Sequence, residues 1–269
     1  MRHARHVVAL QRSAGRCRRA GHTAAAEQLY RRALAVAQRH LPADDLTTAR
    51  VRNDLAVLLK HTGGFDEAAQ LYAAACTVLT ARLGADDPEL ATVFHNIGGL
   101  AHAAGRPADG EAAARRSVEI RDAALGPDHP DAAADRAALA AILADLGRDD
   151  EARTLLEAAL AAFERALGAD HHEVAVTLGT LAALDAKRGD LPTAEQRLRR
   201  ALTIKERTLG HNHLELAPTL GTLGVVRRRQ GDTIEAQALY RRALALYETR
   251  GLEHHPHVAV LRANLRRAA

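Results

Sequence analysis

Residues 63–76 read GGFDEAAQLYAAAC, and residues 231–244, four steps of 42 further along the chain, read GDTIEAQALYRRAL. The same step recurs for a glycine and for an aliphatic residue. The glycines are Gly21, Gly63, Gly105, Gly147, Gly189 and Gly231, and the aliphatic residues are Leu55, Ile97, Leu139, Leu181, Leu223 and Leu265. Self-similarity at a fixed period of this length is the signature of a repeat architecture. The sequence therefore predicts about six copies of one 42-residue unit.

Each unit has the pattern of two helices, as residues 87–124 illustrate. Asp87 is a good N-cap, and Pro88 suits the first helical turn, where its missing N–H costs nothing. Apolar and small residues follow at helical spacing until Gly105 breaks the helix. A second helix runs on to Gly126, a typical residue after a helix end. Aromatic residues make up only 3% of the chain, which favours helices because strands prefer β-branched and aromatic residues.

Small residues recur at one position in each helix of the unit. In the first helix they are Ala56, Gly98, Ala140, Ala182 and Gly224, and in the second they are Ala68, Gly110, Ala152, Ala194 and Ala236. Small side chains on both helices let the two axes approach closely within a hairpin. A bulkier side chain would overpack that contact at a cost of about 1–3 kcal/mol.

The order of these features resembles the tetratricopeptide repeat, with leucine and a small residue in the first helix, a turn glycine, and then alanine and tyrosine in the second. The ordinary repeat has ~34 residues, whereas this one has 42. The added residues lengthen the second helix and the loop after it. This length and the segments LGPDHPDAA (125–133), LGADHHEVA (167–175) and LGHNHLELA (209–217) resemble the kinesin-light-chain type of tetratricopeptide array. The resemblance covers essentially the whole chain.

The period and the resemblance together imply an all-α fold, a right-handed superhelical solenoid of antiparallel helix hairpins. We expect a single array over residues 1–269. Its repeat units are predicted at approximately 5–40, 47–82, 89–124, 131–166, 173–208 and 215–250, followed by a lone helix at 257–269. The lone helix is expected to cap the stack, because the apolar stripe of a terminal repeat otherwise has no neighbour.

The first twenty residues allow two interpretations. Residues 2–20 carry six arginines and no acid, a composition that matches an organellar transit peptide. Stepping back by 42 residues, however, places Val7, Leu10, Ala14 and Cys17 on the core face of a helix. A cleaved leader need not keep phase with the repeats, so we favour a helix of the first repeat.

The sequence lacks the short motifs of common catalytic and nucleotide-binding sites. It contains no GxxxxGK phosphate loop, no HExxH and no GxSxG, so we expect no enzyme and no cofactor. Its fifteen histidines lack the cysteine or carboxylate partners that would complete a zinc site, so we expect no metal. One histidine recurs just before successive first helices, at His129, His171, His213 and His255, where a capping or loop role is expected.

In the resembled family the first helices line a concave groove that holds a peptide. Carried over to this sequence, the groove surrounds NDLA (53–56), HNIG (95–98), AALA (137–140), GTLA (179–182) and GTLG (221–224). The candidate binding residues are Arg50, Asn53, Asp54, Lys60, Thr92, His95, Asn96, His102, Thr180, Lys187, Thr222, Arg228 and Arg229. A small apolar floor of Ala134, Ala137, Ala138, Ala141, Gly179 and Ala183 separates a polar start from a basic end. These positions predict an acidic or amphipathic peptide.

The function predicted from this resemblance is a protein-interaction scaffold that binds a peptide segment of a partner. A nucleic-acid-associated repeat is the first alternative. Its candidate contacts are the clusters Arg18–Arg19, Arg199–Arg200, Arg227–Arg229 and Arg266–Arg267. Acids interleave with these clusters along the chain, and few aromatic residues are available for base stacking. A regulatory module of a larger signalling system is the second alternative.

Two further expectations concern the setting of the protein. No apolar run approaches the ~18 residues of a membrane-spanning helix, and Cys17 and Cys76 have no CxxC spacing. We therefore expect a cytoplasmic protein without a membrane partner. Self-association through the ends of an open solenoid stays open.

Overall fold

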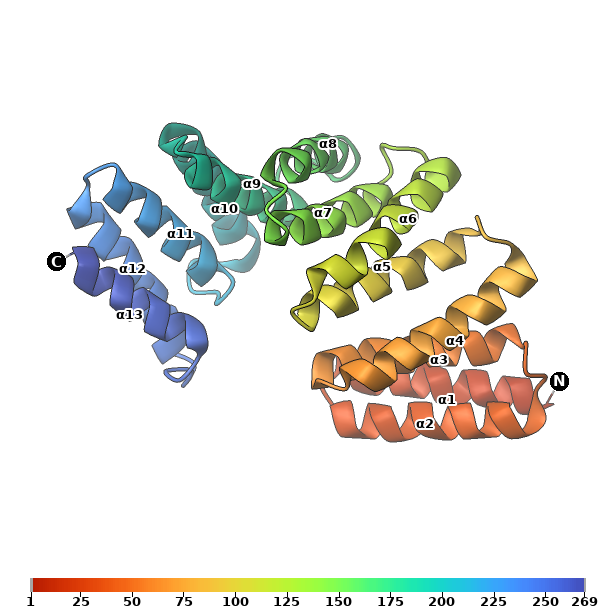
Figure 1. Cartoon of the computed structure of the whole chain (residues 1–269). Helices are drawn as coiled ribbons and strands as arrows, with labels where there is room; N and C mark the ends of the chain where they lie inside the picture. Colours follow the sequence, from red (N-terminus) through yellow and green to blue (C-terminus); the bar gives the residue numbers. More distant parts are fainter. Residues whose placement is uncertain (1, 269) are drawn as a thin grey trace. The chain divides into compact units, whose positions relative to one another are not determined.

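The computed structural model describes residues 2–268, and within that range the secondary structure is thirteen α-helices with no strand (Figure 1). The helices are α1 (Arg2–Arg19), α2 (Thr23–His40), α3 (Leu46–Thr62), α4 (Phe65–Leu83), α5 (Pro88–Ala103), α6 (Pro107–Leu125), α7 (Pro130–Asp145), α8 (Asp149–Leu167), α9 (His172–Arg188), α10 (Leu191–Leu209), α11 (Leu216–Arg229), α12 (Thr233–Glu248) and α13 (Pro256–Ala268). The predicted all-α class is confirmed.

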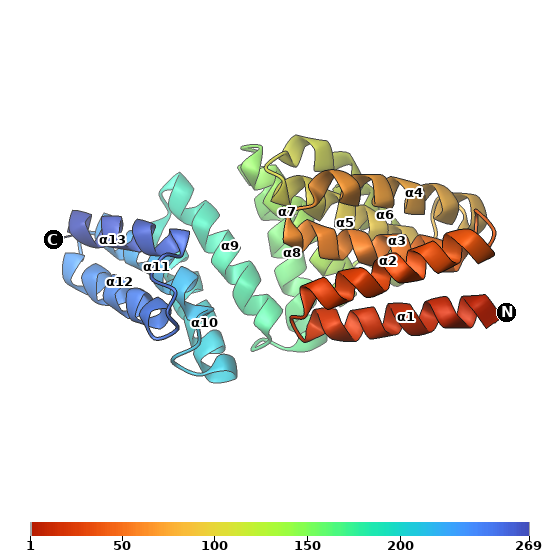
Figure 2. The same ribbon diagram turned by 90° about the horizontal axis from the view of Figure 1, so that it is seen from below.

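The helices form two compact units, and the boundary between the units falls inside α7. Unit 1 runs from the N-terminus to Pro127 and includes Ala141–Gly147, whereas unit 2 comprises Asp128–Ala140 and the chain from Arg148 onward. In unit 1, α1–α2, α3–α4 and α5–α6 pack as antiparallel hairpins (Figures 1 and 2). In unit 2, α9–α10 and α11–α12 form hairpins, and α13 packs on α12 and α11. The predicted hairpins and the lone last helix are confirmed.

The recurring glycines lie at the turns because the backbone there is left-handed. Gly63 follows α3 with φ of 86°, and Gly189 follows α9 with φ of 94°. Residues with a side chain rarely adopt this conformation, whereas glycine does so at no steric cost. Each such turn ends a first helix and reverses the chain, so the second helix returns along the first.

Small residues bring the two helices of a hairpin close together. A Cβ atom on Gly110 of α6 would lie 2.8 Å from the Ala101 Cβ atom and 2.9 Å from the Gly98 carbonyl oxygen of α5. In the α11–α12 hairpin, a Cβ atom on Gly224 would lie 2.5 Å from the ring of Tyr240, which is fully buried. The predicted role of small residues as spacers is confirmed at these positions.

The recurring histidines have the predicted capping or loop roles: His129, His171 and His255 cap α7, α9 and α13, whereas His213 lies in the loop before α11, whose N-cap is Glu215. Backbone N–H groups two residues further on donate to the Nδ1 atoms of His129, His171, His213 and His255, at 3.1–3.3 Å. In the two preceding hairpins Asp45 and Asp87 accept the equivalent bonds through their carboxylates. These acceptors satisfy N–H groups that have no partner inside the helix.

The same substitution at two helical glycines of unit 2 is expected to change stability in opposite directions. Gly224→Ala places a methyl group against the Tyr240 ring and should lower the free energy of unfolding by about 1–3 kcal/mol. At Gly179 a Cβ atom meets nothing within 4 Å, so Gly179→Ala should raise it by up to about 1 kcal/mol through helix propensity. Urea unfolding followed by circular dichroism measures both changes. Equal effects of the two substitutions would contradict this packing.

Candidate peptide-binding surface

In unit 1 the first helices α1, α3 and α5 lie in sequence, α1 against α3 and α3 against α5. The 42-residue step places the same repeat positions next to each other on these helices. Three of these repeat positions are polar on all three helices. In the order α1, α3, α5 they hold Gln11, Asn53 and His95; Arg12, Asp54 and Asn96; and Arg18, Lys60 and His102. These nine residues define what we call the α1–α3–α5 face.

A chain of hydrogen bonds crosses this face from helix to helix. Gln11 Nε2 donates to Asp54 Oδ2 at 2.7 Å. Asn53 Nδ2 donates to the other oxygen of Asp54 at 3.5 Å, and Asn96 Nδ2 donates to Asn53 Oδ1 at 3.0 Å. The chain Gln11–Asp54–Asn53–Asn96 therefore fixes the orientation of two predicted amides, Asn53 and Asn96, before any partner binds.

Two hollows meet along the hydrogen-bond chain. The smaller, of about 190 Å³, is lined by Gln11, Arg50, Asn53, Asp54, Leu79, Glu89, Thr92 and Val93. The larger, of about 630 Å³, is lined by Val8, Gln11, Arg12, Gly15, Arg16, Arg18, Arg19, Tyr30 and Asp54. Because Gln11 and Asp54 line both, the two hollows are neighbours that share this hydrogen-bonded pair.

The charges around the larger hollow are mostly positive. Four arginines line it, and Asp54 is the one carboxylate among its lining residues. None of these arginines forms an ion pair with another residue in the described range 2–268. Lys60 lies on the same face, with its Nζ atom against Gly99. Positive charge therefore exceeds negative charge around this hollow.

Burial changes the protonation of two groups on this face. Asp54 is half-buried, and desolvation raises its pKa above the ordinary carboxyl value, although the Gln11 and Asn53 amides and the Arg18 charge oppose the shift. Desolvation also lowers the pKa of Lys60. Both shifts indicate charges that have lost part of their hydration.

Other predicted residues of unit 1 have partners within the protein. The Arg50 guanidinium donates to both carboxylate oxygens of Glu89, at 2.7 and 2.8 Å. His102 Nε2 lies 3.0 Å from an oxygen of Asp145. Thr92 accepts a hydrogen bond from an arginine of α6 at 3.3 Å. Arg50 and Thr92 border the α1–α3–α5 face and line the smaller hollow, whereas His102 belongs to the face itself.

The remaining predicted residues lie in unit 2, on α9 and α11. The Thr180 and Thr222 hydroxyls donate to carbonyls of their own helices, which leaves them little part in a binding surface. Lys187 pairs with Asp149 at 2.6 Å, and Arg229 donates to the Ala186 carbonyl. The predicted basic end is therefore largely engaged in contacts within the protein. Whether these residues continue the α1–α3–α5 face stays a prediction, as does a single array over the whole chain.

Two family models, both described as tetratricopeptide repeat, match this sequence. One matches residues 44–122, 132–207 and 182–249, and the other matches residues 17–46. The chain belongs to the tetratricopeptide repeat family. Repeats of this family generally bind other proteins, and no catalytic family is among the matches. A search of curated proteins finds no match to this sequence.

Solved structures show the same fold. BtubC (BKLC) from P. vanneervenii is 22% identical with a TM-score of 0.68, and the match covers 93% of each chain. A putative kinesin light chain from Podospora anserina, with nearly identical TPR-like repeats, is 22% identical with a TM-score of 0.65, covering 76% of this chain and 98% of that one. The type IV pilus biogenesis factor PilW is 16% identical with a TM-score of 0.66, covering 89% and 92%. Structural relatives of this tetratricopeptide repeat protein thus include kinesin-light-chain-like proteins, as predicted.

The sequence prediction of the binding surface missed the contribution of α1. One step of 42 residues back from Asn53, Asp54 and Lys60 leads to Gln11, Arg12 and Arg18. The register therefore contained the signal. The same register that places Val7, Leu10 and Ala14 on the core face thus also places the polar residues of α1 beside those of α3.

Two other features of the described residues bear on function. Across 2–268, no three histidine, cysteine, aspartate or glutamate side chains gather in an arrangement that could hold a metal ion. In the same range, every helix is too short or too polar to cross a membrane.

Asp54→Asn is expected to raise the melting temperature at pH 7 and to leave it unchanged at about pH 3. Folding raises the pKa of Asp54. At pH values between the ordinary and the raised pKa the folded state therefore binds more protons than the unfolded state, and the free energy of unfolding falls as the pH rises through that window. An asparagine at position 54 does not ionise, so it avoids this loss of stability, and its side-chain oxygen can still accept the hydrogen bond from Gln11 Nε2. Thermal melts from acid to neutral pH measure the difference, with the exposed Asp66→Asn as control. A lower melting temperature for Asp54→Asn at pH 7 would contradict the assignment.

Proposed function

We propose that this protein is a scaffold that binds an extended, acidic or amphipathic segment of a partner protein on the α1–α3–α5 face of unit 1. The observation that carries the proposal is the hydrogen-bond chain beside an excess of positive charge. Family membership supports a protein partner in general. The face supplies the particular chemistry.

The amides suit a peptide backbone. Each asparagine or glutamine side chain offers two donors and an acceptor with two lone pairs. Within residues 2–268 Asn96 uses one donor, toward Asn53, and Gln11 uses one, toward Asp54. The remaining capacity points to main-chain N–H and C=O groups of a ligand, which every peptide carries irrespective of its sequence.

The cations select the side chains of the peptide. Arg12, Arg18 and Arg19 line the larger hollow and Lys60 lies beside them. An arginine forms two parallel hydrogen bonds with one carboxylate, a geometry that a lysine cannot match. Aspartate and glutamate side chains would therefore bind at the α1 end of the face.

The geometry of the helix layer sets the spacing of those acids. Packed helices lie roughly 8–10 Å apart, and an extended chain advances about 3.3 Å per residue. A peptide that crosses α1 and α3 therefore presents about every third residue to successive helices. We expect two acids separated by two residues in the bound segment.

The ion pairs of two arginines in the unit 2 clusters disfavour the nucleic-acid alternative. Arg199 pairs with Glu195 and Glu235 at 2.8 Å. Arg227 pairs with Glu195, Asp232 and Glu235, at 3.1, 2.6 and 2.5 Å respectively. Phosphates would have to displace these carboxylates, so the clusters are poor contacts for a polyanion.

Lys60→Glu is expected to weaken capture of the partner from native lysate by at least about tenfold, equivalent to 1.4 kcal/mol, because it places a negative charge in the path of an acidic peptide. The Asn53→Ala/Asn96→Ala double variant should weaken capture at both low and moderate salt, since it removes contacts to the backbone. Quantitative pull-down with mass spectrometry measures retention. Arg32→Glu makes a matched charge change at an exposed residue of α2 that lines neither hollow, and should retain the partner.

The retained protein also tests the predicted ligand. Its bound segment, mapped by cross-linking, should contain the acid spacing given above. Retention that is equal in wild type, Lys60→Glu and the double asparagine variant would overturn the assignment of this face.

A further inference from the structure

An aspartate–arginine pair recurs at the loops before successive first helices. The aspartates lie one 42-residue step apart, and each pairs with an arginine from the second helix of the hairpin that follows. The pairs are Asp44–Arg82, Asp86–Arg116, Asp128–Arg165 and Asp170–Arg207. Each ion pair thus joins the loop before a first helix to the second helix of the same hairpin, and the aspartate balances the charge of the arginine.

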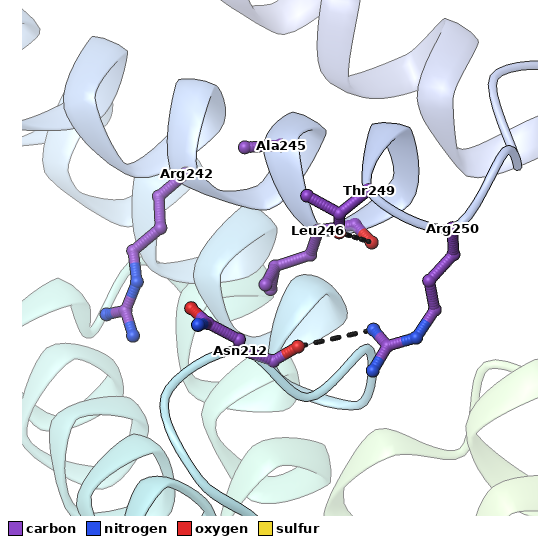
Figure 3. Close-up of a pocket in the computed structure, with 6 residues that line it drawn as sticks. All are labelled: Asn212, Arg242, Ala245, Leu246, Thr249 and Arg250. Atoms are coloured by element: carbon purple, nitrogen blue, oxygen red, sulfur yellow. Dashed lines mark hydrogen bonds between the residues drawn. The ribbon is translucent and has the colours of Figure 1, made fainter.

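The fifth loop breaks this series. Asn212 stands at the next step, so the loop before α11 has no carboxylate at that position. Arg250, at the repeat position of Arg82, donates through Nη1 to the Asn212 backbone carbonyl at 3.2 Å (Figure 3). In the described residues, no acid forms an ion pair with Arg250. Its guanidinium therefore keeps its charge and most of its donors.

A pocket lies beside this uncompensated arginine, within unit 2. It has a volume of about 390 Å³ and is lined by Asn212, Arg242, Ala245, Leu246, Thr249 and Arg250. Arg242, Ala245 and Leu246 lie three and four residues apart on one face of α12, as neighbours along a helix do, and Thr249 and Arg250 directly follow its last residue, Glu248. Figure 3 shows both guanidinium groups reaching toward the Asn212 loop, with Leu246 between them.

The second arginine is partly engaged. Arg242 Nη2 lies 2.5 Å from Glu206 Oε1 and donates to the His211 carbonyl at 3.2 Å. Glu206 is thereby paired, so the charge left over at the pocket is that of Arg250. The Leu246 side chain, 4% exposed, lies between the two arginines, and together with the exposed Ala245 it forms the apolar floor of the pocket.

We propose that this pocket binds a small organic anion, with an acidic head group on Arg250 and Arg242 and a short apolar body over Ala245 and Leu246. The head group takes the place of the carboxylate that the other loops supply themselves. Guanidinium groups bind planar carboxylates and phosphates through paired N–H donors, and the volume is in the range of small-molecule pockets. This site lies outside the α1–α3–α5 face and is independent of the proposed peptide binding.

The test is a titration of the ¹⁵N-labelled full chain with sodium hexanoate, followed by amide chemical shifts. We expect saturable shifts at residues 211–213 and 242–250, in the millimolar range. The neutral 1-hexanol should bind at least tenfold more weakly, because it lacks the charged head. Inorganic phosphate should also bind more weakly than hexanoate, because it makes no contact with the apolar floor.

Asn212→Asp is the decisive variant because it restores the carboxylate of the other loops. It should pair with Arg250 and weaken hexanoate binding at least tenfold without loss of helicity. Arg250→Gln should weaken binding equally, whereas Arg82→Gln, which breaks the equivalent pair in unit 1, should leave it unchanged. The proposal is overturned if Asn212→Asp binds hexanoate as wild type does, if shifts fail to saturate, or if phosphate binds more tightly than hexanoate.

Discussion

The close approach of the two helices in each hairpin is the contact on which the rest of this structure depends. At Gly110 of α6 the backbone of Gly98 in α5 leaves no room for a Cβ atom, and at Gly224 of α11 the Tyr240 ring of α12 occupies the space that a Cβ atom would need. Because close-packed interiors transmit small displacements, these contacts fix how each second helix lies on its first. The first helices of unit 1 then lie next to one another in constant register.

Because the register is constant, residues one period apart in the sequence lie side by side on the surface of unit 1. Residues separated by one 42-residue step become neighbours on α1, α3 and α5, and their polar side chains can join into the chain from Gln11 to Asn96. The positions that depart from the period are then the informative ones. Asn212 stands in a series of aspartates, and Arg12 and Arg18 stand beside amides and a lysine. At the first of these places Arg250 lacks the carboxylate that pairs with Arg82 at the same repeat position, and at the second the arginines form no ion pair within the described residues.

Most of the fold could be predicted from the sequence, because each recurring residue has a local physical reason. Gly63 and Gly189 supply a left-handed turn, and His171 supplies a cap acceptor. The binding surface was predictable only in part. Asn53 and Asn96 were predictable through the resemblance to the kinesin-light-chain type of array, because they lie in the segments NDLA (53–56) and HNIG (95–98) that match its groove positions. The engagement of Lys187 by Asp149 was not predicted, because a long side chain finds its partner through rotamers and neighbouring helices that a sequence pattern does not specify.

The central claim is that unit 1 binds its partner through first helices and not through second helices. Backbone hydrogen–deuterium exchange of the full chain, with and without the captured partner, tests this most directly. The account predicts slower exchange in α1, α3 and α5 on binding, strongest around Gln11, Asn53 and Asn96, with α2, α4 and α6 nearly unchanged. Protection that falls on α2, α4 and α6, with the first helices unaffected, would contradict it.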